Sequence, residues 1–257
     1  MKIDSLDFYR EHTRRYSELS HEFTHSVYPY SSHPQLRGDM DLLHRIVSLS
    51  AGGRSLDAGC GAGARDVHLL HTWGRESFGV DAVAENISLG KELHPEIAAR
   101  LQVADLARPL PFGDSYFDLV TCNAVIQHLP AEITERKTLP ELTRVLAPNG
   151  VLQLMFKVGS GVATVEDNAY GAESVTRTFQ LYSEYRLLEV LDELGCTLIE
   201  AGDNNELGGL MYFDDPKPMR YCVFWVRKYQ SQAYPKTAAL PPAPWSTLRR
   251  FFLPHQR

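Results

Sequence analysis

From residue 53 onward, short apolar runs alternate with stretches whose apolar residues have helical spacing, and this alternation restricts the fold more than any other feature. One such helical stripe consists of Val67, Leu70 and Trp73. The apolar runs, each ending near a polar residue, are expected to be strands at residues 54–59, 76–81, 99–105, 116–123 and 150–158. Strands that alternate with helices are joined by right-handed crossovers, so we predict an α/β fold with a parallel sheet covered on both faces.

The C-terminal half is predicted to complete this sheet. A helix is expected from Ser183, as N-cap, to Gly195, as C-cap, and strands are expected at residues 196–202 and 219–228. Residues 159–180 have no clear period, so we expect a long loop that forms one wall of a substrate site. The polar residues expected in that wall are Glu166, Asp167, Asn168 and Arg177.

The N-terminal segment is predicted to be helical. One amphipathic helix is expected over residues 5–25, where Tyr9, Tyr16 and Phe23 recur every seven residues, and a second over residues 39–49. The loop between them is rich in proline.

The composition is that of an acidic globular protein. The 257 residues include 26 Lys and Arg against 32 Asp and Glu, a formal charge of −6, which disfavours general nucleic-acid binding. The four cysteines lack the paired spacing of zinc or redox sites. The N-terminus is too charged for a signal peptide, and no apolar run approaches the ~20 residues of a membrane span. We therefore expect a cytoplasmic protein with neither a membrane nor a nucleic-acid partner.

A glycine-rich loop lies between the first predicted strand and the following helix. Gly59 permits a tight turn there, and Gly61 lets a ligand approach the backbone without meeting a Cβ. The helix N-terminus offers free N–H groups to an electronegative ligand. With Ala64, and with Asp81 at the end of the second strand, the loop satisfies the dinucleotide fingerprint and is compatible with NAD(P).

The same loop also resembles motif I of the class I S-adenosylmethionine-dependent methyltransferases, a D-x-G-x-G-x-G motif in which Gly63 supplies the last glycine and Asp57 the carboxylate. This resemblance extends in order over residues 36–230 and favours S-adenosylmethionine over NAD(P). The other segments that carry it are Asp105 and Leu106 with residues 110–112, residues 117–120 leading to Asn123, residues 139–156 and residues 182–196.

The resemblance implies a Rossmann-like, seven-stranded, mostly parallel sheet with helices on both faces, an antiparallel last strand and an N-terminal helical lid. The chain then divides into a lid (1–35), a methyltransferase domain (36–230) and a proline-rich C-terminal tail (231–257). The tail is basic and aromatic, and is compatible with docking on the domain, with bridging two copies into a homodimer or with contacting an anionic partner; docking is favoured, because exposed aromatic residues would form an apolar patch.

The resemblance also assigns roles to individual residues. The cofactor-binding residues it implies are Asp57, which orders the loop; Gly59, Cys60, Gly61 and Gly63 at the methionine part; Asp81 and Ala82 at the ribose; Asp105 and Leu106 at the adenine; and Asn123 and Tyr16 near the sulfonium. His128 follows the fourth strand and is the candidate general base or substrate contact, because imidazole titrates near neutrality.

The expected activity is methyl transfer to an O, N or C nucleophile of a small metabolite. The Asn/Asp-Pro-Pro-aromatic box of nucleic-acid amino methyltransferases is replaced by Asn123-Ala124-Val125-Ile126, which favours a small substrate. Two alternatives remain: a non-catalytic cofactor-binding scaffold of the same fold, and an NAD(P)-binding oxidoreductase.

Residues 21–25 match the zinc-protease motif H-E-x-x-H on a predicted helix. Both histidines lie about 200° around the helix from Phe23, so they are expected to point away from the buried stripe. The positions that would continue a metzincin motif hold Tyr28 and Ser31. We therefore predict no catalytic metal.

Overall fold

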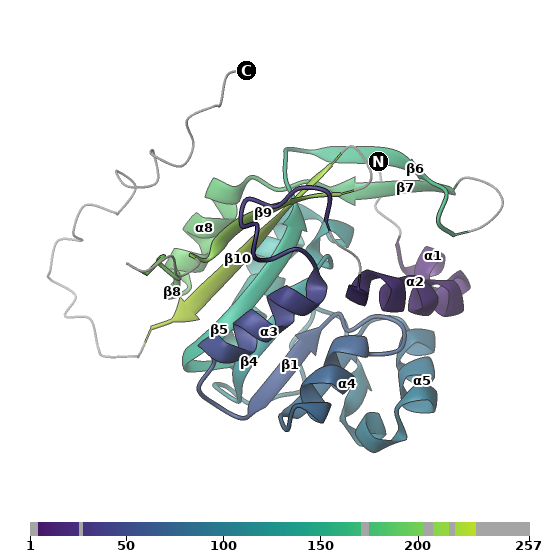
Figure 1. Ribbon diagram of the computed structural model, residues 1–257, viewed down its shortest axis with the longest axis horizontal. Helices are drawn as coiled ribbons and strands as arrows, with labels where there is room; N and C mark the ends of the chain where they lie inside the picture. The colour runs from purple at the N-terminus through teal and green to yellow at the C-terminus, as the bar shows by residue number, and fades with distance from the viewer. Residues whose placement is uncertain (1–4, 26–27, 171–174, 203–207, 216–218, 230–257) are drawn as a thin grey trace, which may run out of the picture.

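A mixed eight-stranded sheet with helices on both faces forms the centre of the computed structural model, which describes residues 5–25, 28–170, 175–202, 208–215 and 219–229 (Figure 1). The strand order is β3-β2-β1-β4-β5-β10-β8, and β9 also pairs with β10. The strands of this sheet are β1 Arg54–Ala58, β2 Glu76–Asp81, β3 Leu101–Val103, β4 Phe117–Asn123, β5 Leu146–Lys157, β8 Cys196–Leu198, β9 Leu210–Asp214 and β10 Arg220–Lys228.

The predicted mostly parallel sheet with an antiparallel last strand is confirmed. Strands β1 to β5 pair in parallel, whereas β10 runs antiparallel to β5, β8 and β9. Strand β8 pairs with residues 226–228 of β10 and β9 pairs with residues 220–224. The two short strands thus share one edge of β10, so eight strands fill seven positions.

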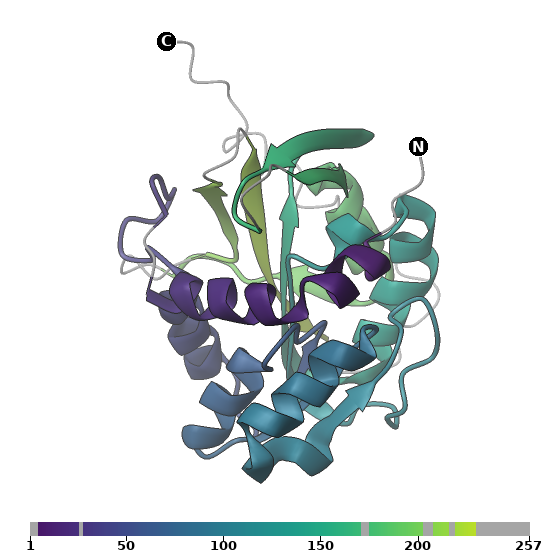
Figure 2. The same cartoon turned by 90° about the vertical axis from the view of Figure 1, so that its right-hand side faces the viewer.

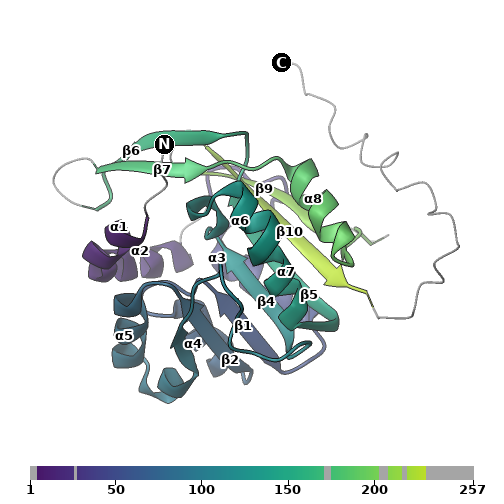
Figure 3. The ribbon, with the colours of Figure 1, turned by 180° about the vertical axis from the view of Figure 1, so that it is seen from behind.

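Helices cover the sheet on both faces, as the alternation predicts. They are α1 Leu6–Glu11, α2 Thr13–His25, α3 Asp39–Leu49, α4 Arg65–Thr72, α5 Ala84–Leu93, α6 Ala131–Ile133, α7 Leu139–Val145 and α8 Glu184–Glu193, with the helical turns η1 Pro95–Arg100, η2 Ile126–His128 and η3 Thr134–Thr138. Along β5, Leu152, Leu154 and Phe156 pack with α7 and α8 on one face (Figure 3). Val151 and Met155 pack with α3 on the other, which is the period-two alternation of a strand buried on both sides.

The single helix predicted for residues 5–25 is instead two helices that meet at His12. The backbone there has φ −110° and ψ 16°, outside the helical region. The hydroxyl of Thr13 donates to the carbonyl groups of Tyr9 and Arg10, and His12 Nδ1 lies 2.8 Å from the carbonyl oxygen of Phe8. Such side-chain bonds compete with the regular helical ladder. Helices α1 and α2 together lie across the glycine loop (Figure 2).

The long loop predicted for residues 159–180 is also wrong in its local structure. Strands β6 Val162–Asp167 and β7 Val175–Gln180 form an antiparallel pair separate from the central sheet. The hairpin lies beyond the end of β5, beside α1 (Figures 1 and 2). It has few buried side chains, so the apolar alternation that identifies a core strand is weak there. Strand β9, half buried at the edge of β10, was not predicted either.

Some predictions concern parts of the chain that lie outside the described residues. These include the C-terminal tail at 231–257 with any dimer contact it makes, and the side chain of Phe23 on which the orientation of the H-E-x-x-H histidines depends. Within the described part of the chain, no helix combines the length and the apolar character needed to cross a membrane.

Candidate active site

The glycine loop joins β1 to α4 and bends sharply over residues 59–64. Gly59, Gly61 and Gly63 all have positive φ, from 65° to 89°, which favours glycine over residues with a side chain. The amides of Gly59 and Cys60 donate to the Val80 carbonyl oxygen at 2.8 and 2.9 Å, so the loop is anchored to β2. A Cβ at Gly61 would lie 2.9 Å from Tyr16 Cε1 of the lid helix α2.

Asp81 ties this loop to the end of β2. Its carboxylate accepts the Gly61 amide at 3.0 Å, the Val83 amide at 2.8 Å and the Asn86 side chain at 3.2 Å. Burial raises the pKa of Asp81, and these three hydrogen bonds oppose that rise. The carboxylate is therefore held in one orientation at the mouth of the loop.

A cavity of about 360 Å³ adjoins Asp81. Its wall contains Ala82, Asp105 and Leu106, so the structure brings together the residues predicted for ribose and adenine. Asp105 accepts the Ala107 amide at 2.8 Å, a short turn that fixes the carboxylate at the cavity edge. The remaining wall is mostly apolar, which suits a flat aromatic group held by polar atoms at its edge.

A second cavity of about 500 Å³ lies on the other side of the glycine loop. Its wall contains Cys60, predicted at the methionine part of the cofactor, Asn123, predicted near the sulfonium, and Asp57, predicted to order the loop. The two cavities share five lining residues, Tyr9, Tyr16, Gly59, Gly61 and Ala124. One elongated ligand can therefore lie across the loop and extend into both.

Gly63 differs from the other predicted loop residues because it lines neither cavity. A Cβ at this position would lie 2.8 Å from Ser17 Oγ of α2 and 3.4 Å from Leu93 of α5. Gly63 thus permits the close packing of the lid helix and α5 against the loop.

Asp57 lies beneath the loop at the end of β1, where it is buried. Burial, together with the nearby Asp66 carboxylate, raises the pKa of Asp57 to about 8, while the hydroxyl of Thr121 donates to it at 2.9 Å. Arg65 neutralises the neighbouring acidic groups, lying 2.6 Å from Asp66 and 3.1 Å from Asp39. Burial and the neighbouring carboxylate therefore favour the protonated form of Asp57.

His128 is half-buried behind Tyr9 and, of the two cavities, lines only the smaller. Its Nε2 lies 3.1 Å from the Tyr9 hydroxyl and its Nδ1 lies 3.0 Å from Ser5 Oγ. Because Arg177 donates to the Tyr9 oxygen, the Tyr9 proton is available to His128 Nε2. Burial and the cations Arg177 and Lys157 hold the pKa of His128 well below its usual value, so the ring is neutral at neutral pH.

Two ion pairs line the larger cavity and bring charge into its wall. Arg177 on β7 lies 3.0 Å from Asp167 on β6, and Lys157 at the end of β5 pairs with Asp215 after β9. Asp167 and Arg177 were predicted as a substrate wall, whereas Lys157 and Asp215 were missed. Lys157 could have been found from the sequence, because it lies near the end of an otherwise mostly apolar strand. A lysine buried at such a position requires an acidic partner.

The Arg177 guanidinium also lies among four aromatic rings, those of Phe8, Tyr9, Tyr170 and Phe179, at 4.9–5.2 Å from their centroids. These contacts connect helix α1 to the hairpin across the cavity. Gln127 borders the same cavity and is 3% exposed. Within the described ranges, its Oε1 has no hydrogen-bond partner, so it can accept one from a ligand.

Comparisons with known proteins agree with this geometry. Residues 56–154 match the family model described as a methyltransferase domain. The chain is 31% identical over 108 residues to a demethylmenaquinone methyltransferase of Staphylococcus saprophyticus, a match that covers 41% of this chain and 45% of that protein. Among the first curated relatives, the matches span from 45% to 66% of the relatives' own lengths.

Solved structures share the fold at low sequence identity. A Burkholderia thailandensis 1,6-didemethyltoxoflavin-N1-methyltransferase, solved with its substrate and S-adenosylhomocysteine, has a TM-score of 0.55 and 19% identity, covering 88% of this chain and 92% of that one. The [4+2]-cyclase SpnF has a TM-score of 0.58 and 15% identity, covering 89% and 96%. The fold alone therefore does not decide the reaction.

Proposed function

We propose that this chain, whose residues 56–154 match the methyltransferase-domain family, is a class I S-adenosylmethionine-dependent methyltransferase that transfers the methyl group to a small polar metabolite. The observation that carries this proposal is the pair of cavities that adjoin at Gly59 and Gly61, one beside Asp81 and one beneath the lid. An adenosine fits the first and a methionine chain reaches the second.

The cofactor fits the residues that are present. Asp81 is oriented by its three hydrogen bonds, so its remaining lone pair can accept a ribose hydroxyl. Asp105 and Leu106 border the position proposed for adenine, and Asn123 and Cys60 border the methionine end. Gly61 leaves space where any side chain would meet Tyr16. These roles follow the residues predicted from the sequence.

When bound, S-adenosylmethionine supplies a methyl group made electrophilic by its sulfonium. The protein then has to align an acceptor atom with that methyl group and exclude water. Tyr9 and Tyr16 of the lid line both cavities, so they are placed to close over the reacting atoms. The Tyr9 oxygen can take a proton from an acceptor hydroxyl or amine while Tyr9 passes its own proton to His128 Nε2.

A polar acceptor is supported by the charged wall of the larger cavity. Arg177, Asp167, Lys157 and Asp215 contribute two cations and two anions, with several tyrosine hydroxyls around them. Burying an isoprenoid tail against these groups would remove them from water without new hydrogen bonds. Arg65 and four further carboxyl groups also line this cavity, so its carboxyl groups outnumber its cations, which disfavours an acceptor with a large negative charge.

Two other functions would use the same fold. A scaffold would bind the cofactor without turnover, and an oxidoreductase would bind NAD(P) at the glycine loop. The proposed proton path from Tyr9 to His128 and the polar cavity beside it favour an enzyme over a scaffold. The methyltransferase family match over residues 56–154 favours S-adenosylmethionine over NAD(P).

Equilibrium binding and turnover test the proposal. We expect S-adenosylhomocysteine to bind the full-length protein and NAD to fail at the same concentrations. Asp81→Asn replaces one acceptor oxygen by an NH₂ group and should weaken S-adenosylhomocysteine by about 10- to 100-fold, at 1.5–3 kcal/mol for a charged hydrogen bond. Asp114→Asn, at a carboxylate 79% exposed, is the matched control.

Methyl transfer from labelled cofactor to a panel of small polar metabolites then separates enzyme from scaffold. Turnover that is reduced in Tyr9→Phe supports the proposed proton path. Binding of NAD without S-adenosylhomocysteine would refute the cofactor assignment, and cofactor binding without any turnover would favour the scaffold.

A further inference from the structure

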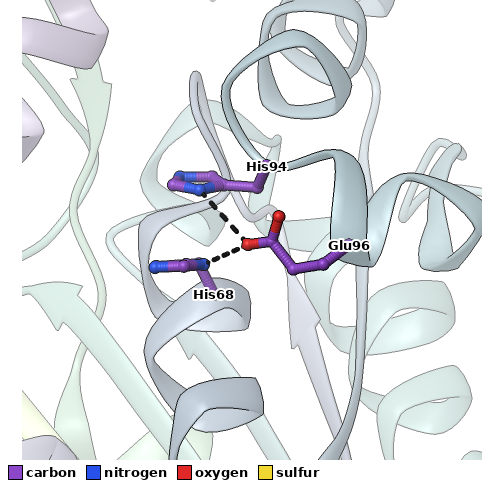
Figure 4. A group of neighbouring side chains, drawn as sticks. All are labelled: His68, His94 and Glu96. Atoms are coloured by element: carbon purple, nitrogen blue, oxygen red, sulfur yellow. Dashed lines mark ion pairs between the residues drawn. The ribbon is translucent and has the colours of Figure 1, made fainter.

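Two histidines and a glutamate gather on the outer side of α4 and α5, outside both cavities (Figure 4). His68 lies on α4, His94 follows the last residue of α5, and Glu96 lies in the turn η1. The two imidazole rings stack at a centroid distance of 3.9 Å with 14° between their planes. Figure 4 shows both rings beside the Glu96 carboxylate.

The spacing of the donor atoms is close to that of a metal site. Glu96 Oε1 lies 2.8 Å from His68 Nδ1 and 3.8 Å from His94 Nδ1. Zinc bonds of about 2.1 Å in tetrahedral geometry place donor atoms about 3.4 Å apart, a value between the two observed distances. The three donor atoms lie within 4.8 Å of one another, and rotation of the two imidazole rings out of their stacked arrangement would direct all three at one ion.

The backbone that carries these residues is rigid. Val67 beside His68, Ile87 on α5 and Ile97 beside Glu96 are all buried in one apolar cluster. The side chains themselves remain accessible, because His68 is 32%, His94 13% and Glu96 43% exposed.

We propose that His68, His94 and Glu96 bind a divalent first-row transition-metal ion of the Zn²⁺ type. Two imidazole nitrogens and one carboxylate oxygen suit zinc and its neighbours, whereas Mg²⁺ and Ca²⁺ prefer oxygen ligands alone. A bound ion would connect α4 to the end of α5. Because α4 begins directly after the glycine loop and the His68 amide donates to the Ala64 carbonyl, the ion would brace the loop from behind.

This site differs from the H-E-x-x-H motif of α2 that the sequence shows. None of the three proposed ligands belongs to that motif, which spans residues 21–25. The proposed ligands come from two other helices and a turn. Substitutions can therefore separate the two sites.

Calorimetric titration of the tag-free, full-length protein with ZnCl₂ at pH 7.5 tests the proposal, with MgCl₂ as a second titrant. We expect one Zn²⁺ per chain and no Mg²⁺ binding. His68→Ala, His94→Ala and Glu96→Gln should each weaken Zn²⁺ by at least about 10-fold, since each removes one of three ligands. His71→Ala, on the same helix but outside the cluster, should bind as the unmodified protein does.

Circular dichroism and S-adenosylhomocysteine binding of the zinc-free variants show whether they remain folded. Absence of stoichiometric Zn²⁺ binding by the unmodified protein would overturn the proposal. So would Zn²⁺ binding that survives His68→Ala and His94→Ala but is lost in His21→Ala. None of these outcomes depends on methyl transfer. The metal site and the proposed function are therefore tested independently.

Discussion

At the scale of single residues, the glycine loop depends on what is absent from Gly61. The amide of this residue donates to Asp81 while its missing side chain leaves space for Tyr16. Its positive φ of 65° adds a second reason for glycine. Gly61 therefore allows three features at one position: the bend of the loop, the hydrogen bond to Asp81 and the close approach of Tyr16.

Gly61→Ala is expected to weaken S-adenosylhomocysteine binding by at least about 10-fold. A left-handed backbone costs a residue with a Cβ about 1–2 kcal/mol, and the new methyl group must displace Tyr16. Isothermal titration measures the effect. Gly53→Ala is the control, since a Cβ at Gly53 meets nothing within 4 Å. Equal affinity in the two variants would contradict the role given to Gly61.

His128 makes a second prediction, on stability against pH. The folded pKa is depressed, so the neutral ring contributes stability above the unfolded pKa of about 6.5 that is lost as pH falls towards the folded pKa. The free energy of unfolding should therefore fall by up to about 1.4 kcal/mol per pH unit below pH 6.5. In His128→Gln this loss should be absent. Denaturant unfolding at pH 7.5, 6 and 5 measures the free energy of unfolding of the two proteins. If this free energy falls equally with pH in both proteins, the prediction for His128 is wrong.

At the scale of elements, the lid and the hairpin depend on each other. Helix α1 supplies Phe8 and Tyr9, and the hairpin supplies Arg177, which contacts both rings and bonds to the Tyr9 hydroxyl. Asp167 holds the guanidinium from the other side. The hairpin was predicted as a wall of the site but not as strands, because its contacts are with the lid and the cavity instead of the core.

Arg177→Lys should loosen α1 without removing the charge that Asp167 needs. A single ammonium cannot bond to Asp167 and Tyr9 in the fork geometry of a guanidinium. Losing one such bond, worth about 1–3 kcal/mol, should speed amide exchange of residues 6–11 by about 5- to 100-fold. Hydrogen-exchange mass spectrometry measures this, with Arg186→Lys on the exposed face of α8 as control. Unchanged exchange in α1 would show that Arg177 does not hold the lid.

At the scale of the whole molecule, the residues of the candidate site gather at one edge of the sheet. The carboxyl ends of β1, β2, β4 and β5 meet there, and α1, α2 and the hairpin cover them (Figures 1 and 2). The turn at Asn149 and Gly150 lies in β5 before its buried part, away from both cavities. Ligands of open parallel sheets bind at the carboxyl edge, so binding should affect the two edges differently.

S-adenosylhomocysteine at 100 times its Kd is expected to stabilise the protein by about 2.7 kcal/mol, or about 5–10 °C in Tm. The same concentration of NAD should leave Tm unchanged. Hydrogen exchange should slow in α1, α2 and the glycine loop and stay the same around Asn149. Protection spread evenly over both edges would indicate general stabilisation instead of a ligand at the predicted edge.

The sequence by itself predicted the alternation of strands and helices, the glycine loop and Asp81 at the end of the second strand, because these follow from local periodicity and short spacings. The resemblance to methyltransferases added the carboxylates Asp57 and Asp105. The sequence could not determine the break at His12, the hairpin, or which distant side chains meet. Tyr9 and Arg177 are 168 positions apart, and Lys157 and Asp215 are 58 apart.

Only the tertiary structure decided these meetings, because each depends on how helices and strands pack in space. It moved His128 from a candidate at the mouth of the site to a half-buried partner of Tyr9. It also separated Gly63, which packs the lid helix, from the glycines that border the cavities. Local sequence pattern therefore predicts most of the secondary-structure elements, whereas tertiary packing decides which side chains line the two cavities.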